Sequence, residues 1–156
     1  MCWQCDHPGA TTADYLRELR KTVLKHTWAV QYVEDDRKPF AYTIGLHSRG
    51  FAEYLVTGVP PDRAVQLLNA VADYTLREVA PAPGDTMEIA GEVHLEFVRV
   101  DQPDAHLGLA VALYGPEVAA LQLVWRDDRG HSPWCPDFDE GRGSQPVLGK
   151  RGPQNA

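Results

Sequence analysis

Apolar residues along the first half of the chain change period twice, which predicts a helix followed by strands. A helical period that starts after a capping threonine, Thr11 or Thr12, predicts a helix over about residues 12–25. Strict alternation then predicts two strands, Trp28 to Val33 and Phe40 to Leu46, joined as a hairpin by a polar stretch. A short third strand at 54–57 ends at Gly58 and two prolines.

The second half opens with a helix that starts at Pro60 or Pro61. Its expected buried stripe consists of Val65, Leu68, Val71, Ala72, Thr75 and Val79. Two strands follow, at about 86–90 and 93–100, and a change of phase in the second indicates either a bulge or burial on both faces. A third helix is predicted from Pro103 to Tyr114, and a last strand from Ala120 to Arg126.

Strands and helices are interspersed without strict alternation, which favours an α+β fold: a mainly antiparallel β-sheet with about three helices packed on it. The chain contains no repeat and no linker that would divide it. We therefore expect one domain over residues 11–149, preceded by a Cys/His-containing segment at 1–10. Residues 150–156 are expected to form a disordered tail.

Composition narrows the functional classes. The 156 residues are 44% hydrophobic and 24% charged, as in ordinary globular proteins. A formal net charge of -7 disfavours nucleic acid as a partner. The sequence has no apolar run long enough to span a bilayer and no export signal, and its three cysteines suit a reducing compartment, so we expect a cytoplasmic protein.

The N-terminus carries the most specific chemical pattern. Cys2 and Cys5 have the two-residue gap that lets two thiolates reach one tetrahedral ion, and His7 follows closely. A fourth ligand is expected from the irregular segment after the last strand: Cys135, with His131 as the alternative. The pattern predicts a structural zinc site that ties the two ends of the chain together.

Three other interpretations use the same cysteines. In the first, Cys2 and Cys5 are incidental thiols on a frayed terminus, and Cys135 is a small buried side chain that fills space in the core. A redox dithiol is less favoured, because the predicted helix begins too late to lower a thiolate pKa. Finally, removal of Met1 would make Cys2 a terminal nucleophile with its own amine as base.

Several other polar and aromatic residues have both a functional and a structural interpretation. His47 follows a strand as a candidate base, but such a residue is more often solvated. Glu53 and Gln122 either point into a pocket or form hydrogen bonds with other residues of the core. Trp125 and Trp134 form a pocket wall or close the core. The acidic residues of the C-terminal region are interpreted as turn chemistry and solvated surface: Asp127, Asp128, Asp137, Asp139 and Glu140.

Three stretches of the sequence resemble a bacterial family known as domain of unknown function 4262. They are Trp28 to Val33 with Pro39 to Leu46, Thr57 with Gly58, and Leu121 to Trp125 with Pro133 and Trp134. The resemblance spans nearly the whole chain. It implies one domain in a bacterial cytosol and supplies no activity or ligand. It draws attention to a set of positions that mark either a shared core or a shared pocket: Tyr42, Thr43, Gly45, Gln122, Trp125 and Trp134.

We thus expect a small metal-binding protein with structural zinc, and a small-molecule pocket formed by Tyr42, Thr43, Gln122, Trp125 and Trp134. The alternative is a metal- or cysteine-dependent hydrolase or transferase, in which the metal keeps one position open. A third class is a protein-interaction module. No phosphate loop, nucleophile elbow or helical zinc-protease motif occurs in the sequence.

Overall fold

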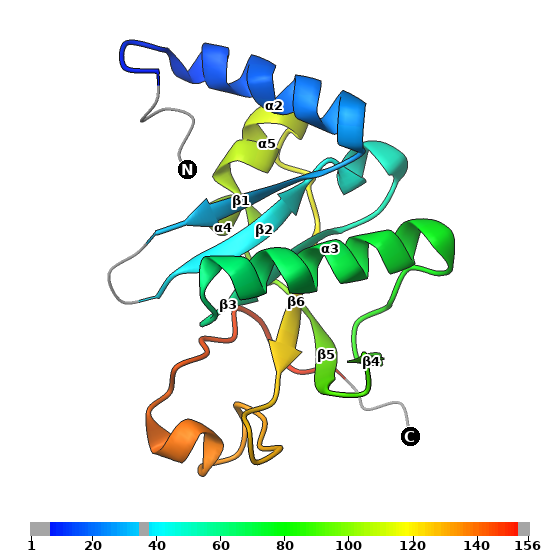
Figure 1. Cartoon of the computed structure of the whole chain (residues 1–156), viewed down its shortest axis with the longest axis vertical. Coiled ribbons are helices and arrows are strands. Elements are labelled where there is room, and N and C mark those ends of the chain that lie inside the picture. The colour runs from blue at the N-terminus through cyan, green and yellow to red at the C-terminus, as the bar shows by residue number, and fades with distance from the viewer. Residues whose placement is uncertain (1–6, 35–37, 153–156) are drawn as a thin grey trace.

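A single six-stranded sheet organises the protein (Figure 1). The computed structural model describes residues 7–34 and 38–152. The strands stand in the order β1-β2-β3-β6-β5-β4, and every neighbouring pair is antiparallel except β3 and β6, which are parallel. Their bounds are β1 Ala29–Val33, β2 Phe40–Ile44, β3 Glu53–Thr57, β4 Thr86–Ile89, β5 Val93–Arg99 and β6 Ala120–Trp125. The predicted α+β class is confirmed.

The sheet is made of two antiparallel halves joined at its centre. β1, β2 and β3 follow one another both in the chain and in the sheet, and so do β4, β5 and β6. The halves meet where β3 runs parallel to β6, with Glu53 opposite Ala120 and Leu55 opposite Gln122. Because the two strands are parallel, the loops that leave their carboxyl ends emerge at the same edge of the sheet.

The helices are α2 Thr12–His26, α3 Pro61–Arg77, α4 Pro103–His106 and α5 Gly108–Tyr114. α2 begins with a capping box, in which Thr11 Oγ1 accepts a hydrogen bond from the Asp14 amide and the Asp14 carboxylate accepts one from the Thr11 amide. The helix predicted from Pro103 to Tyr114 is divided at Leu107, whose backbone is not helical and whose side chain is fully buried. No helix within residues 7–34 and 38–152 combines the length and the hydrophobicity needed to cross a bilayer.

Helices cover both faces of the sheet (Figure 1). α3 packs on one face, while α2 and α5 pack on the other, each over its own apolar cluster. Residues 95–98 of β5 are all buried, so the change of phase seen in the sequence reflects burial on both faces. The predicted stripe of α3 is wrong at Val65 and Val79, which are 39% and 61% exposed. Val65 sits beside the stripe that begins at Ala64, and Val79 lies beyond the helix end.

The chain after β6 forms an irregular segment at the end of the molecule opposite α2 and then returns along the sheet (Figure 1). Two glycines allow this return. A β-carbon at Gly58 would lie 2.3 Å from the Ser144 carbonyl oxygen, and one at Gly149 would lie 1.9 Å from the Arg99 carbonyl oxygen. Arg151, which lies within the tail predicted at 150–156, pairs with Glu96.

Candidate functional site

The charge buried at the start of β3 belongs to the architecture. The carboxylate of Glu53 is fully buried and accepts hydrogen bonds at 2.9–3.1 Å from four donors: Thr43 Oγ1 and the amides of Gly45, Leu46 and His47. Burial raises the pKa of Glu53 above its ordinary value, and the four donors oppose that rise because they favour the ionised form. The carboxylate holds the turn η1 (Leu46–Arg49) onto the sheet.

Gln122 also serves the architecture. Its side chain is fully buried; Nε2 donates to the Pro146 carbonyl at 2.8 Å, and Oε1 accepts from the Leu148 amide at 2.8 Å. Gln145 adds two further hydrogen bonds. Its side-chain oxygen accepts from the Trp125 amide, and its side-chain nitrogen donates to the Trp125 carbonyl. We call residues 145–148 the returning segment. Side-chain hydrogen bonds between it and β6 thus take the place of the backbone hydrogen bonds that would join two neighbouring strands.

The five residues expected to share one pocket occupy different environments. Tyr42, Thr43 and Gln122 are buried and bonded within the protein; burial raises the pKa of Tyr42 to about 12, and its hydroxyl accepts a bond from the Leu109 amide. Trp134 and Trp125 do line cavities, but two different ones. Trp125 is anchored by its indole N–H, which donates to the Thr57 carbonyl at 2.9 Å.

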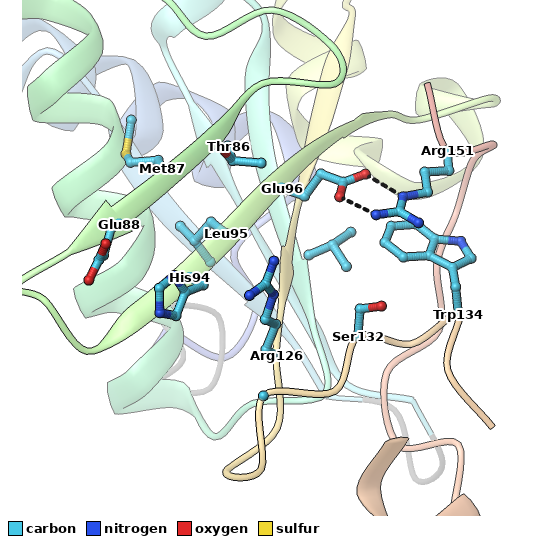
Figure 2. A pocket seen from close by; sticks show the side chains of 12 residues that line it. Thr86, Met87, Glu88, His94, Leu95, Glu96, Arg126, Ser132, Trp134 and Arg151 are labelled. Atoms are coloured by element: carbon cyan, nitrogen blue, oxygen red, sulfur yellow. Dashed lines mark hydrogen bonds and ion pairs between the residues drawn. The ribbon is translucent and has the colours of Figure 1, made fainter. Parts of the chain in front are cut away.

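The cavity lined by Trp134, which we call the sheet-face cavity, encloses about 430 Å³ on the face opposite α3 (Figure 2). β4 and β5 form its floor, and the segment 130–134 forms a wall through Gly130, Ser132 and Trp134. Arg151 closes one side: its guanidinium makes two 3.0 Å bonds to Glu96 and lies 4.4 Å from the centre of the Trp134 ring. Arg126 extends between these groups and His94 in Figure 2.

A larger cavity, of about 880 Å³, adjoins it at the carboxyl ends of β3 and β6. We call it the strand-end cavity. The loops 58–60 and 126–130 line it, together with the first turns of α3 and with Val93. His94, Arg126 and Gly130 belong to both cavities, so the two meet at the end of the sheet.

Three potential metal ligands converge in the segment after β6. One ligand atom each of His131, Cys135 and Asp137 lies within 4.8 Å of the others; we call this group the 131–137 cluster. The imidazole and the thiol are half-buried, and Asp137 is exposed. Nitrogen, sulfur and carboxylate oxygen are the ligand types that zinc takes in proteins. None of the three side chains lines either cavity.

Asp127 organises the backbone around this cluster. Its carboxylate accepts hydrogen bonds at 2.8–3.0 Å from the amides of Arg129, His131 and Asp139. Burial opposes ionisation of Asp127, but the three amides outweigh it and hold its pKa below the ordinary value. His131 Nδ1 is enclosed 3.4 Å from Asp127 Oδ2 without making a well-formed hydrogen bond among the described residues.

The two described members of the predicted zinc set, His7 and Cys135, lie in different parts of the molecule. Cys2 and Cys5 lie outside the described residues. His7 is exposed, in the segment that leads into α2, whereas Cys135 lies after β6, and these two segments occupy opposite ends of the molecule (Figure 1). Of the predicted ligands, the described structure brings together Cys135 and the alternative, His131. The set that joins both chain ends stays a prediction.

Sequence reasoning did not select Asp137 as a ligand or Arg126 and Arg129 as cavity residues. The spacing His-x3-Cys-x-Asp was a usable signal for the first, but the acidic residues around it looked like an ordinary solvated surface. The arginines follow directly after a strand, where binding loops often start. His47 is also less solvated than expected, because its ring packs 5.3 Å from that of Tyr114.

Comparison with known proteins gives one match. The profile of a family described as "Domain of unknown function (DUF4262)" matches residues 22–139, which is more than half of the chain. Neither a curated protein nor a solved structure gives a significant match.

Proposed function

We propose a function for this protein from its own geometry, because it belongs to the DUF4262 family, which is described only as a domain of unknown function. The protein binds one zinc ion through His131, Cys135 and Asp137, and the ion fixes the segment after β6. The observation that carries this proposal is the convergence of three different ligand types within 4.8 Å. Tetrahedral zinc with bonds of about 2.0–2.3 Å needs ligand separations of roughly 3.3–3.8 Å, which requires only a small contraction.

The surroundings of His131 support this assignment. Asp127 lies against Nδ1, and a carboxylate beside one imidazole nitrogen orients the ring when the other nitrogen binds a metal. The same carboxylate holds three backbone amides of the segment. The ion would therefore lock a loop that already has a preferred shape, which lowers the entropic cost of forming the site.

A structural role suits the position of the cluster. Gly130, Ser132 and Trp134 face the sheet-face cavity, whereas His131 and Cys135 do not line it. An ion held by His131 and Cys135 would fix the conformation in which Gly130, Ser132 and Trp134 form the cavity wall. A small molecule in that cavity would then contact the wall rather than the metal.

The test is metal content, measured by mass spectrometry on protein purified without a metal-affinity tag. We expect about one zinc per chain, lost in Cys135→Ser, in His131→Ala and in Asp137→Asn. The double variant Cys2→Ser/Cys5→Ser should retain the metal. Loss in that double variant with retention in Asp137→Asn would instead establish the site that ties both chain ends. Absence of metal from the wild type would refute both sets.

An enzyme is the second candidate, favoured by the number of ligands: the cluster supplies three side chains, and catalytic zinc keeps its fourth position for water. Cobalt-substituted protein separates the two roles. An open position would let added azide change the visible cobalt spectrum at millimolar concentration. A spectrum indifferent to azide, together with loss of protection of residues 127–142 after chelation, would support the structural role.

A further inference from the structure

The strand-end cavity lies where the two parallel strands of the sheet end together. The loop 58–60 follows β3 and the loop 126–130 follows β6, and both line the cavity. Backbone segments from two distant parts of the chain thus converge on one space, as they do in ligand sites at the carboxyl ends of parallel strands. None of the three ligands of the 131–137 cluster lines this cavity, although Asp127 contacts both.

Three arginines surround this cavity: Arg63 from α3, and Arg126 and Arg129 from the loop after β6. All three are exposed. In the part of the chain that the structure describes, none of their guanidinium groups forms an ion pair or a hydrogen bond. A guanidinium group without a paired carboxylate keeps its N–H donors available to an anion that enters the cavity.

The carboxylates of the cavity form no ion pair with these arginines among the described residues. Asp127 is committed to three backbone amides. Glu92 and Asp128 are exposed and form no ion pair with the arginines among the described residues. Three arginines and three carboxylates line the cavity, so their formal charges balance, but no carboxylate pairs with an arginine of the cavity among the described residues.

Apart from His94, the rest of the lining is apolar. Val59 and Leu67 are buried, and Val93 and the Trp125 ring complete the surface beneath the arginines. A volume of about 880 Å³ lies in the range of sites for small organic molecules and is far larger than a single ion requires. The ligand should accordingly have an apolar body in addition to its charge.

We propose that the strand-end cavity binds a small organic phosphate, with the phosphate group on Arg63, Arg126 and Arg129 and an apolar or aromatic body against Trp125. Guanidinium groups bind phosphate through paired N–H donors, and three of them match a doubly charged phosphate monoester better than a singly charged carboxylate. The proposal assigns a ligand class to a cavity that the sequence did not reveal.

Isothermal titration of the full chain with phenyl phosphate tests the proposal. We expect saturable binding that weakens about tenfold in Arg63→Gln and in Arg129→Gln, each of which removes one charged hydrogen-bond donor group. Arg77→Gln is the matched control, because Arg77 lies at the other end of α3 and pairs with Asp73. It should bind as the wild type does. Equal affinity in all three variants would overturn the assignment.

Three further titrants define the ligand class. Phenol lacks the anion, benzoate carries one negative charge, and inorganic phosphate lacks the apolar body, so all three should bind at least about tenfold more weakly than phenyl phosphate. Equal binding of phenol would make the cavity a simple apolar site and overturn the role of the arginines. Equal binding of benzoate would overturn the preference for phosphate, and equal binding of inorganic phosphate would overturn the role of Trp125. Thermal unfolding of each variant checks that the fold is unchanged.

Discussion

The two ends of β3 handle charge in opposite ways. At its start, the Glu53 carboxylate is fully buried and bonded to four donors. Beyond its end, Arg63, Arg126 and Arg129 stand exposed around a cavity, and their guanidinium groups form no ion pair or hydrogen bond among the described residues. The Glu53 carboxylate has its hydrogen-bond partners within the protein, whereas the guanidinium groups gain partners only from solvent or from a ligand. Completeness of hydrogen bonding, rather than charge itself, separates a structural site from a candidate binding site here.

Free energy explains the difference. A buried carboxylate without partners is so unfavourable that the fold must supply them. An exposed guanidinium is satisfied by water at little cost, so nothing in folding requires a partner for it. Substitutions at the two ends of β3 should therefore affect different measurements: stability at Glu53 and ligand binding at the arginines.

The largest effect is expected for Glu53→Gln. The new amide N–H group would face a donor instead of an acceptor, and the amides of η1 would lose bonds in a buried site. We expect the free energy of unfolding to fall by about 3 kcal/mol in urea denaturation at neutral pH. Glu92→Gln, at an exposed position of the strand-end cavity, is the control and should change stability by less than about 0.5 kcal/mol. Similar values for both variants would remove the contrast.

Gln122→Ala should have the next largest effect. It removes the buried side chain that bonds the Pro146 carbonyl and the Leu148 amide, and we expect a loss of about 2 kcal/mol. Hydrogen exchange of the Leu148 amide should accelerate more than exchange within β3. Gln66→Ala, on the exposed side of α3, serves as the control. Unchanged protection of Leu148 would show that Gln145 and the backbone bond from the Asp101 amide to the Leu148 carbonyl hold the returning segment without Gln122.

A smaller effect is expected in the pH dependence of stability. Burial raises the pKa of the Glu53 carboxyl group in the folded protein above the 4.5 expected for it in the unfolded chain. Between these two pKa values, Glu53 is protonated in the folded protein and ionised in the unfolded chain. Stability of the wild type relative to Glu53→Gln should thus fall as pH rises from about 4.5 to the raised pKa, by at most about 1.4 kcal/mol per pH unit. Above the raised pKa the difference should be constant. A difference that grows with rising pH would mean that the four donors outweigh burial.

The smallest effect on stability is expected where the largest effect on binding is proposed. Arg63→Gln combined with Arg129→Gln should change the free energy of unfolding by less than about 0.5 kcal/mol, since both side chains are exposed and unpaired among the described residues. The same double variant should lose most of its affinity for phenyl phosphate. A loss of several kcal/mol in stability would show that the arginines are structural after all.

Local patterns predicted much of the fold. The alternation of Phe40 to Ile44 and of Ala120 to Trp125 identified strands, and a proline at the start of α3 marked its beginning. Errors arose where tertiary contacts decide. Leu107 divides a predicted helix because its side chain is drawn into the core, and Val65 is exposed because α3 turns its neighbouring stripe to the sheet. The spacing of apolar residues along the sequence predicts neither the break at Leu107 nor the exposure of Val65.

The sites depended even more on long-range contacts. Glu53 and Gln122 were recognised as polar groups that needed partners, but their partners lie in other strands and in the returning segment. The arginines at the strand-end cavity meet only because β3 and β6 are parallel neighbours, a pairing that no local pattern specifies. Asp137 was attributed to solvated surface, since a single chain offers no way to see that His131 and Cys135 turn toward it.

The division of the sheet into two antiparallel halves has a consequence for the order of folding. Within each half, neighbouring strands are also consecutive in sequence, so their pairing needs comparatively short loop closures. We expect the β1–β2 and β4–β5 hairpins to form before β3 meets β6, and pulsed hydrogen exchange would show simultaneous protection of all strands if this order is wrong. The seam between the halves is also where the strand-end cavity opens. The binding surface would then come into existence only at the last step, when the two halves dock.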